Sequence, residues 1–451
     1  MNRFFAVLTF ACAIASSAQA ASPPPAPAPV VTYVQAGALL DRPGREPRGA
    51  STIIVRDGAI VAVRDGFVPP EAGAKVIDLR DQFVMPGLID MHVHLWGIGG
   101  DPMQDRLTAL NRDVADNLMY ATGNARVTLN AGFTTVRDLG GNARGIRALR
   151  DAIERGDVEG PTIVNAGEVI SVTGGHGDDA NGVAEDFADA IRAHQTNICD
   201  GADDCRRVVR LQVSLGAQVI KFAATGGVLS NVSGGLGRAV TPEEMRAIVE
   251  TAHGLGLKVA AHSHAAEGTK AALEAGVDTI EHGTFLDDEA IRLFKAKGAW
   301  LVPTMMAQVV VEQARAGLLP PAMIKKAEAA VAAGLVSHKK AISAGVKIAF
   351  GTDTGVSKHG DNAGEFALMV AAGLTPAQAL RAATTSAAEA LGRSDTIGSI
   401  EPGKDADIIA VSGNPLLDVT RMEHVDFVMR EGRVHRGSER EVPTIVGKGR
   451  A

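Results

Sequence analysis

Aromatic side chains are scarce in this 451-residue chain, at 4%, and it has only three cysteines. Basic residues form no long run, and the formal net charge is −7. Because binding to a polyanion requires a concentrated positive surface, the sequence argues against a nucleic-acid-binding protein. Hydrophobic residues make up 46% of the chain, which provides ample apolar surface for one large core and a smaller one.

The amino terminus has the pattern of a secretory signal peptide. Arg3 precedes an apolar stretch over residues 4–15, and small residues follow up to Ala20. We expect residues 1–20 to be removed during export to the periplasm or the medium. The apolar stretch is too short for a stable transmembrane helix, so we expect no membrane span. Cys199 and Cys205 are candidates for a disulfide in an oxidising compartment, with two free thiols as the alternative.

The rest of the chain shows two patterns. Residues 21–30 form a proline-rich linker. Short β-like runs occupy residues 31–85, with an Asp57-Gly58 hairpin turn, and similar runs return in residues 395–451. We predict that these two ends pair into one small β-sandwich domain. Over residues 86–394, roughly eight strand-like runs alternate with helical stretches, which is the layout of an α/β protein with a TIM (β/α)8 barrel.

The strand-like runs are mostly apolar, and several end at a polar residue. We predict strands at residues 83–91, 133–138, 162–166, 219–222, 259–262, 279–282, 300–304 and 348–353. Helices are predicted between them, for example at residues 242–255, 268–275 and 376–391. The active site of such a barrel forms where the carboxyl ends of the strands meet the following loops.

Six polar residues lie at or close to these predicted strand ends: His92, His94, Lys221, His262, His282 and Asp353. Residues i and i+2 of a strand face the same side, so His92 and His94 present two imidazoles to one divalent metal. A His-x-His sequence is common by chance. Its position after Pro-Gly-Leu-Ile-Asp at the first barrel strand favours the metal site, and Asp90 is expected to shape the turn.

Lys221 is embedded in an apolar run, where an ammonium group is costly to bury. It pairs with an acid, extends its amine to solvent, or is carboxylated, in which case its carbamate would bridge two metals. His262 and His264 form a second His-x-His. We choose His262, the last residue of the strand, as the ligand, and leave His264 as substrate-facing or as polar packing. The Asp353 carboxylate can bind metal and accept a proton, with a helix N-cap as the alternative.

Two further residues are candidates for binding substrate. His176 lies in a glycine-rich loop after the third predicted strand, where it could polarise a carbonyl or hold a carboxylate. Arg238 is a weaker candidate for the carboxylate. Arg137 and Asp138 are expected to form a structural ion pair. The remaining histidines are expected at the surface, namely His194, His253, His338, His359, His424 and His435.

Together these motifs resemble the metal-dependent amidohydrolase superfamily over nearly all of the chain after the signal peptide. The resemblance rests on Pro-Gly-Leu-Ile-Asp-Met-His-Val-His, on Gly-Phe-Thr-Thr-Val-Arg-Asp-Leu-Gly from Gly132, and on the strand lysine, the later histidines and Gly-Thr-Asp. The sequence from Gly398 to Ile409 also fits the family's return to its small β domain. In detail the chain is similar to the imidazolonepropionase-related branch, with its Xaa-Pro dipeptidases and ochratoxin A-hydrolysing enzymes.

The resemblance implies two Zn²⁺ ions per chain. One would be held by His92, His94 and Asp353, and the other by His262 and His282. Carboxylated Lys221 and a hydroxide would bridge the two ions. Imidazolonepropionase is mononuclear and lacks this lysine, so Lys221 favours the dipeptidase-like members.

The resemblance further implies hydrolysis of the amide bond in dipeptides or N-acyl amino acids, including ochratoxin A to phenylalanine and ochratoxin alpha. Asp353 would move the proton from the attacking hydroxide to the leaving amine. Relatives are often homo-oligomers, up to octamers. A cyclic-amide hydrolase or a lactonase is an alternative within enzymes. A catalytically inactive scaffold is the non-enzyme alternative, although such proteins tend to lack ligands that are all present here.

Overall fold

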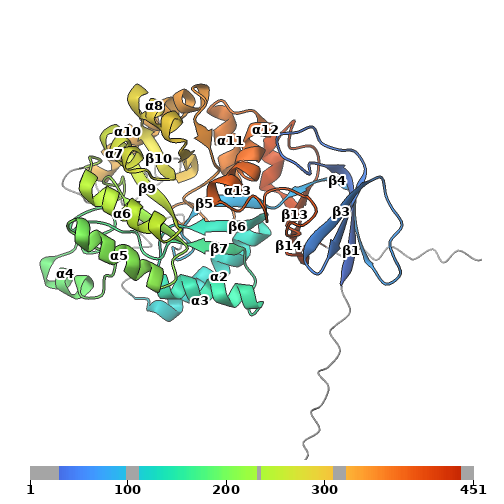
Figure 1. Ribbon diagram of the computed structural model, residues 1–451, viewed down its shortest axis with the longest axis horizontal. Coiled ribbons are helices and arrows are strands. Elements are labelled where there is room, and N and C mark those ends of the chain that lie inside the picture. Colours follow the sequence, from blue (N-terminus) through green and yellow to red (C-terminus); the bar gives the residue numbers. More distant parts are fainter. Residues whose placement is uncertain (1–29, 98–110, 231–234, 308–320, 438–451) are drawn as a thin grey trace, which may run out of the picture.

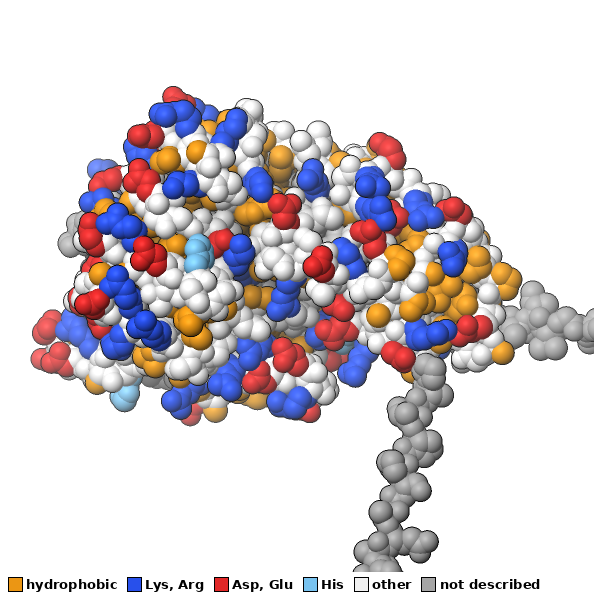
Figure 2. Space-filling model, viewed as in Figure 1, with side chains coloured by type: hydrophobic (Ala, Val, Ile, Leu, Met, Phe, Trp, Pro, Cys, Tyr) orange, Lys and Arg blue, Asp and Glu red, His pale blue; other side chains and the backbone are white. Residues whose placement is uncertain are grey.

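The computed structural model describes residues 30–97, 111–230, 235–307 and 321–437. The predicted signal peptide and nearly all of the proline-rich linker lie outside these residues. Within the described ranges, no helix is both long and apolar enough to cross a bilayer. Basic and acidic side chains are interspersed over the face in Figure 2.

Strands from both ends of the chain share one seven-stranded sheet, in the order β15-β14-β13-β4-β1-β2-β3. These strands are β1 (Val31–Leu39), β2 (Ser51–Arg56), β3 (Ala59–Asp65), β4 (Lys75–Pro86), β13 (Ile408–Val411), β14 (Val425–Arg430) and β15 (Arg433–Arg436). Asp57 and Gly58 join β2 to β3 with φ values of 51° and 87°. Positive φ at both residues is what a two-residue hairpin turn of type I′ requires. The antiparallel pairing of β4 with β13 joins the strands from the amino-terminal part of the chain to those from the carboxyl-terminal part. The arrangement as a β-sandwich stays a prediction.

Eight shorter strands form two parallel sheets, β5-β6-β7 and β12-β11-β10-β9-β8. They are β5 (Leu88–Val93), β6 (Phe133–Asp138), β7 (Thr162–Asn165), β8 (Val219–Ala223), β9 (Lys258–Ala265), β10 (Thr279–Phe285), β11 (Trp300–Val302) and β12 (Lys347–Ile348). Hydrogen bonds connect the sheets at both edges. Gln218 N donates to Asn165 O over 2.7 Å, and Met91 N donates to Phe350 O over 2.9 Å. The described strands thus make two linked sheets and are not assigned to one closed sheet.

Helices lie around these two sheets in Figure 1. They are α2 (Val114–Asn130), α3 (Ala143–Arg155), α4 (Glu185–Arg192), α5 (Ala202–Ser214), α6 (Pro242–Gly254), α7 (Ala266–Ala275), α8 (Asp288–Lys297), α10 (Pro321–Ser343), α11 (Gly364–Ala371), α12 (Pro376–Ala382) and α13 (Thr385–Leu391), with the 3-10 helix η2 (Val419–Glu423). The start of α6 shows how the local sequence determines where a helix begins. Thr241 and Glu244 form a capping box around Pro242, which satisfies amide groups that the first turn leaves free.

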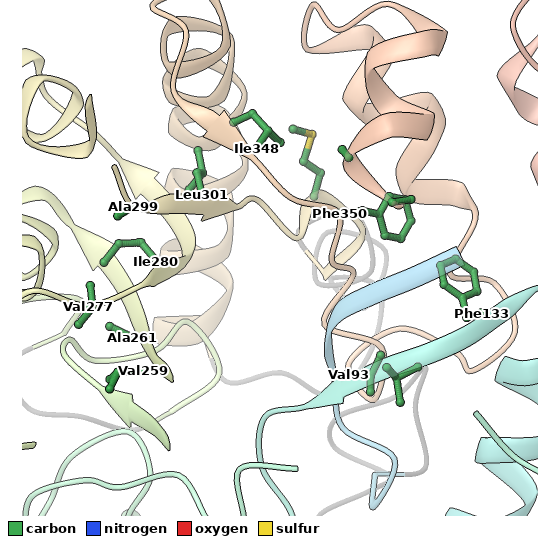
Figure 3. Packing of buried hydrophobic residues seen from close by; sticks show 14 of the residues in the cluster. Val93, Phe133, Val259, Ala261, Val277, Ile280, Ala299, Leu301, Ile348 and Phe350 are labelled. Atoms are coloured by element: carbon green, nitrogen blue, oxygen red, sulfur yellow. The ribbon is translucent and has the colours of Figure 1, made fainter. Parts of the chain in front are cut away.

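Apolar side chains fill the space between strands and helices (Figure 3). Val259, Ile280 and Leu301 are fully buried on three neighbouring strands, β9, β10 and β11. On the other sheet Phe133 lies against Phe350, with ring centroids 5.5 Å apart. This core fixes the strand ends that carry the site.

Several predicted elements have different boundaries in the structure. The strand predicted at 348–353 is reduced to β12 at Lys347–Ile348, so Asp353 lies beyond its end, and two other elements are divided. The strand predicted at 83–91 is divided, because residues up to Pro86 belong to β4 of the seven-stranded sheet and β5 begins at Leu88. The helix predicted at 376–391 is interrupted between α12 and α13. There the carbonyls of Ala382 and Ala383 accept hydrogen bonds from Phe350 N and Ile89 N. These two carbonyls face the strands and not the next turn of a continuous helix. Such tertiary hydrogen bonds cannot be predicted from the local sequence.

Candidate functional site

A cavity of about 450 Å³ lies at the carboxyl ends of the short parallel strands. All six predicted ligand residues line it, and so do His176 and His264. Arg238 is not among the described residues that line it, and its guanidinium lies 3.4 Å from the carboxylate of Glu267 instead. Residues as far apart in the sequence as His92 and Asp353 therefore line the same cavity.

Three donor atoms form a nearly equilateral triangle at one side of the cavity. His92 Nε2 lies 3.3 Å from His94 Nε2 and 3.4 Å from Asp353 Oδ1. His94 Nε2 lies 3.2 Å from the same oxygen of Asp353. Ligands that bind one tetrahedral zinc at about 2.0–2.1 Å are separated by about 3.3–3.4 Å, so the triangle fits one metal ion.

A second group of donors consists of His262, His264 and His282, whose ligand atoms all lie within 4.8 Å of one another. His282 also belongs to a group of the same kind with His92 and Asp353, so it lies between the two. The Nδ1 atoms of His264 and His282 are 2.8 Å and 2.7 Å from threonine hydroxyls. Their Nε2 atoms are thereby free to bind another group, and His264 belongs to this group of possible ligands together with His262.

Burial sets the protonation state of these histidines. It lowers the pKa of His92 to about 4 and that of His264 to about 3. The pKa values of His262 and His282 are lowered well below the ordinary value, again mainly by burial. The cluster is therefore neutral at pH 7, and neutral imidazole is the form that binds a metal.

The backbone is strained at the same place. His282 has φ 71°, Asp353 φ 60° and Thr304 φ 50°, all in the left-handed region that side chains other than glycine rarely adopt. Each such residue costs about 1–3 kcal/mol and persists only where surrounding structure enforces it. Strain at two proposed ligands and at the threonine that contacts His282 indicates a functional centre.

The Lys221 side chain is buried in β8 and its amine faces the cavity. Burial lowers its pKa to about 8, against the opposing influence of Glu281 and Asp353. Within the described ranges, neither carboxylate reaches ion-pair distance of the Lys221 amine. Direct pairing with an acid and extension of the amine to solvent are thus not what the structure shows, since Lys221 is buried.

The sequence analysis missed Glu281, which orients the first histidine. Glu281 accepts a hydrogen bond of 2.9 Å from His92 Nδ1 and one of 2.8 Å from Arg137. Burial alone would raise the pKa of Glu281, but Arg137 and His92 lower it to about 2. The anion fixes the proton of His92 on Nδ1 and leaves Nε2 free toward Asp353. The sequence signal that could have identified Glu281 was its position directly before the predicted ligand His282.

The predicted ion pair between Arg137 and Asp138 is wrong. Adjacent residues of a strand point to opposite faces, so Arg137 reaches Glu281 while Asp138 accepts hydrogen bonds from the amides of Leu95 and Gly140. Asp90 was expected to shape a turn, but it lies within β5 and joins this strand to the segment that leads to Asp353. It accepts hydrogen bonds from the His92 amide and from Thr352.

Two histidines expected at the surface are buried. His338 on α10 donates from Nε2 to the carbonyl of His282 over 2.7 Å, and His359 Nε2 contacts Gly97 O over 3.2 Å. Burial lowers the pKa of both to about 4. For His338 a signal existed, because it precedes the buried Ala341 by three residues and so lies on the inner face of the helix.

His176 lies in the loop after β7, with its ring 4.2 Å from that of His262 between centroids. Burial lowers the pKa of His176 to about 4. Gly227 makes room for it, since a Cβ atom there would lie 2.3 Å from the imidazole. Cys199 and Cys205, downstream of this loop, are joined by a disulfide.

The site and the fold define a hydrolase with a histidine- and carboxylate-rich centre at the ends of parallel strands. The amidohydrolase family profile matches residues 83–435, and the chain belongs to this family. An ochratoxinase from Aspergillus niger is 32% identical over 430 residues, which cover 90% of this chain and 87% of that protein. An imidazolonepropionase from Geobacillus thermodenitrificans is 26% identical over 417 residues, covering 85% and 89%.

Solved structures agree with this assignment. The crystal structure of a Xaa-Pro dipeptidase with bound methionine in the active site is similar to this chain, with a TM-score of 0.84 and 38% identity. The match covers 90% of this chain and 100% of that one. The resemblance stated from the motifs is confirmed, and the chain is a hydrolase that acts on amide bonds.

Proposed function

We propose that this chain is an exported zinc amidohydrolase with two metal ions, which hydrolyses the amide bond of dipeptides or N-acyl amino acids, ochratoxin A included. The observation that carries the proposal is the triangle of donor atoms from His92, His94 and Asp353 beside a buried lysine. The relatives named ochratoxinase and Xaa-Pro dipeptidase support this substrate class.

The residues present fit two metal ions. His92, His94 and Asp353 would hold one, and His262 and His282 the other, with carboxylated Lys221 between them. Only an unprotonated amine adds to carbon dioxide, and the lowered pKa of Lys221 favours that form. When bound, the metals supply a hydroxide at neutral pH and polarise the amide carbonyl.

Asp353 is suited to move the proton. Burial raises the pKa of its carboxyl, but His92, His94 and Lys221 together lower it to about 2, so it is ionised at pH 7. It accepts the proton of the attacking hydroxide as the oxygen bonds to the carbonyl carbon. It then gives that proton to the nitrogen as the carbon–nitrogen bond breaks, because an amine leaves poorly unless protonated.

The cavity suits a substrate with one apolar part. Besides the histidines it is lined by apolar side chains, among them Val228, Leu229 and Val331. Its volume of about 450 Å³ suits a small molecule. His176 and His264 face the cavity and would contact the carbonyl or carboxylate of the substrate, whereas the position of Arg238 speaks against its predicted role.

We also propose that the eight short strands close into a barrel over residues 86–394, and that residues 31–85 and 395–451 form a separate small β-sandwich domain. The hydrogen bonds between the two parallel sheets support the barrel. We further propose a homo-oligomer. Hydrophobic side chains gather over the seven-stranded sheet in Figure 2, and Val61 and Phe67 are each 43% exposed. Exposed apolar patches often mark contact surfaces.

Metal analysis and a substrate panel test the proposal together. The purified protein should hold about two zinc ions per chain and hydrolyse N-acyl amino acids or dipeptides varied on each side of the amide. Lys221→Met should lose at least one zinc ion and most activity, while Lys339→Met, at an exposed position, should match the wild type. Activity confined to cyclic amides or lactones would favour the alternative enzyme class. A chain without metal or activity would favour the scaffold.

A further inference from the structure

The loop that carries His176 is fastened to a separate segment of the chain, residues 196–200. Ser171 N donates to Asn197 O over 3.1 Å, and Cys199 N donates to Ser171 O over 2.8 Å. Farther along the loop, the hydroxyl of Thr173 donates to Asp200 over 2.6 Å. The loop therefore lies along this segment like one strand beside another.

One side chain of the segment spans the loop. The amide nitrogen of Asn197 donates to Val169 O and to Gly177 O, both over 2.7 Å. These two carbonyls lie before and directly after His176, so a single buried side chain fixes the separation of the two ends of the turn. Asn197 is only 5% exposed, so water cannot readily replace it as the donor.

The segment is itself anchored on the side away from the cavity. The disulfide joins Cys199 to Cys205 in the first turn of α5, and both cysteines are buried in the main apolar core. Gly201, between them, donates its amide to Glu244 on α6 over 2.7 Å. The position of Asn197 is therefore set by two helices of the core.

We infer that Asn197 is a positioning residue for His176, and that the Cys199–Cys205 disulfide holds Asn197 in place for that task. Asn197 does not line the cavity, so any effect on substrate must pass through the loop. The His176 ring packs against His262 and Gly227, but its Nδ1 atom has no hydrogen-bond partner within the described part of the chain. The consequence for catalysis rests on the substrate-contacting role of His176 in the proposed function.

A double-mutant cycle between Asn197→Ala and His176→Ala tests the inference. We expect Asn197→Ala to lower kcat/KM by about ten- to hundredfold, and to have no further effect once His176 is alanine. Asn197→Ser, a smaller change, and the paired variant Cys199→Ser with Cys205→Ser should each give a weaker loss that also vanishes in the His176→Ala background. Ile53→Val, in the seven-stranded sheet, controls for lowered stability and should leave kcat/KM unchanged.

Hydrogen exchange of residues 168–178 gives a readout that does not need activity. Asn197→Ala should accelerate exchange in this loop and leave β9 and β10 as protected as in the wild type. Additive losses in kcat/KM, or unchanged exchange in the loop, would overturn the inference. A wild-type protein that hydrolyses no amide would refute the proposed function, and the exchange experiment would still decide whether Asn197 holds the loop.

Discussion

Replacing Glu281 by glutamine should damage both the stability of the protein and its affinity for metal. Glu281 is fully buried and accepts hydrogen bonds from Arg137 and from His92. Glutamine has nearly the same shape but no charge, so the guanidinium of Arg137 would lose its counter-charge inside the protein. Removing one partner of a buried ion pair costs about 3–5 kcal/mol.

The effect on metal comes through the His92 imidazole. At present the Glu281 carboxylate accepts the Nδ1 proton, so Nε2 is the free nitrogen that lies 3.4 Å from Asp353 Oδ1. A glutamine amide can donate to Nδ1, which would move the proton to Nε2 and block that ligand. Loss of a carboxylate behind a ligating histidine lowers metal affinity by about 10–100-fold.

Urea unfolding of the metal-free protein measures the first effect, and competition with a zinc chelator measures the second. Glu243→Gln is a matched control, because Glu243 pairs with Arg246 at the surface, where both side chains are more than half exposed. Its removal should change the free energy of unfolding by less than about 1 kcal/mol. If Glu281→Gln were as stable as this control and bound zinc equally well, the assigned role of Glu281 would be refuted.

Three other predictions concern the same centre. Asp353→Asn should lower kcat by about 10²–10⁴-fold with an unchanged circular dichroism spectrum, and retained turnover would exclude it as the proton carrier. Gly227→Ala should lower kcat/KM by about tenfold or more, since its methyl group displaces the His176 ring, whereas Gly254→Ala, with open space around it, should have no effect in the same assay. The metal-free protein should lose stability as the pH falls from about 6.5 toward about 4. Burial lowers the pKa of His92 to about 4, so the folded protein favours the neutral imidazole. The stability that this preference provides is fully present above the pKa of the unfolded chain, and it is lost as the pH falls from that value to the folded value of about 4. Thermal unfolding that is independent of pH over this range would contradict the last prediction.

Much of the site could be read from the sequence because its residues sit in short local patterns. His92 lies in β5 and His94 directly follows the last residue of that strand, and Asp353 follows an apolar run in Gly-Thr-Asp. Strand geometry then dictates which way such side chains face. Strands near both ends of the chain were predictable for a similar reason, since turn residues such as Asp57-Gly58 and alternating apolar residues specify strands locally.

The tertiary structure decided what depends on contacts between distant residues. Glu281 and His92 are 189 positions apart, and no local pattern joins them. The same holds for His338, whose partner is a backbone carbonyl on β10, and for the break between α12 and α13. The sequence by itself determined which residue types stand at the strand ends. Only the packed fold decided which of them share one buried cavity, because burial and charge pairing arise when separate elements close around the same space.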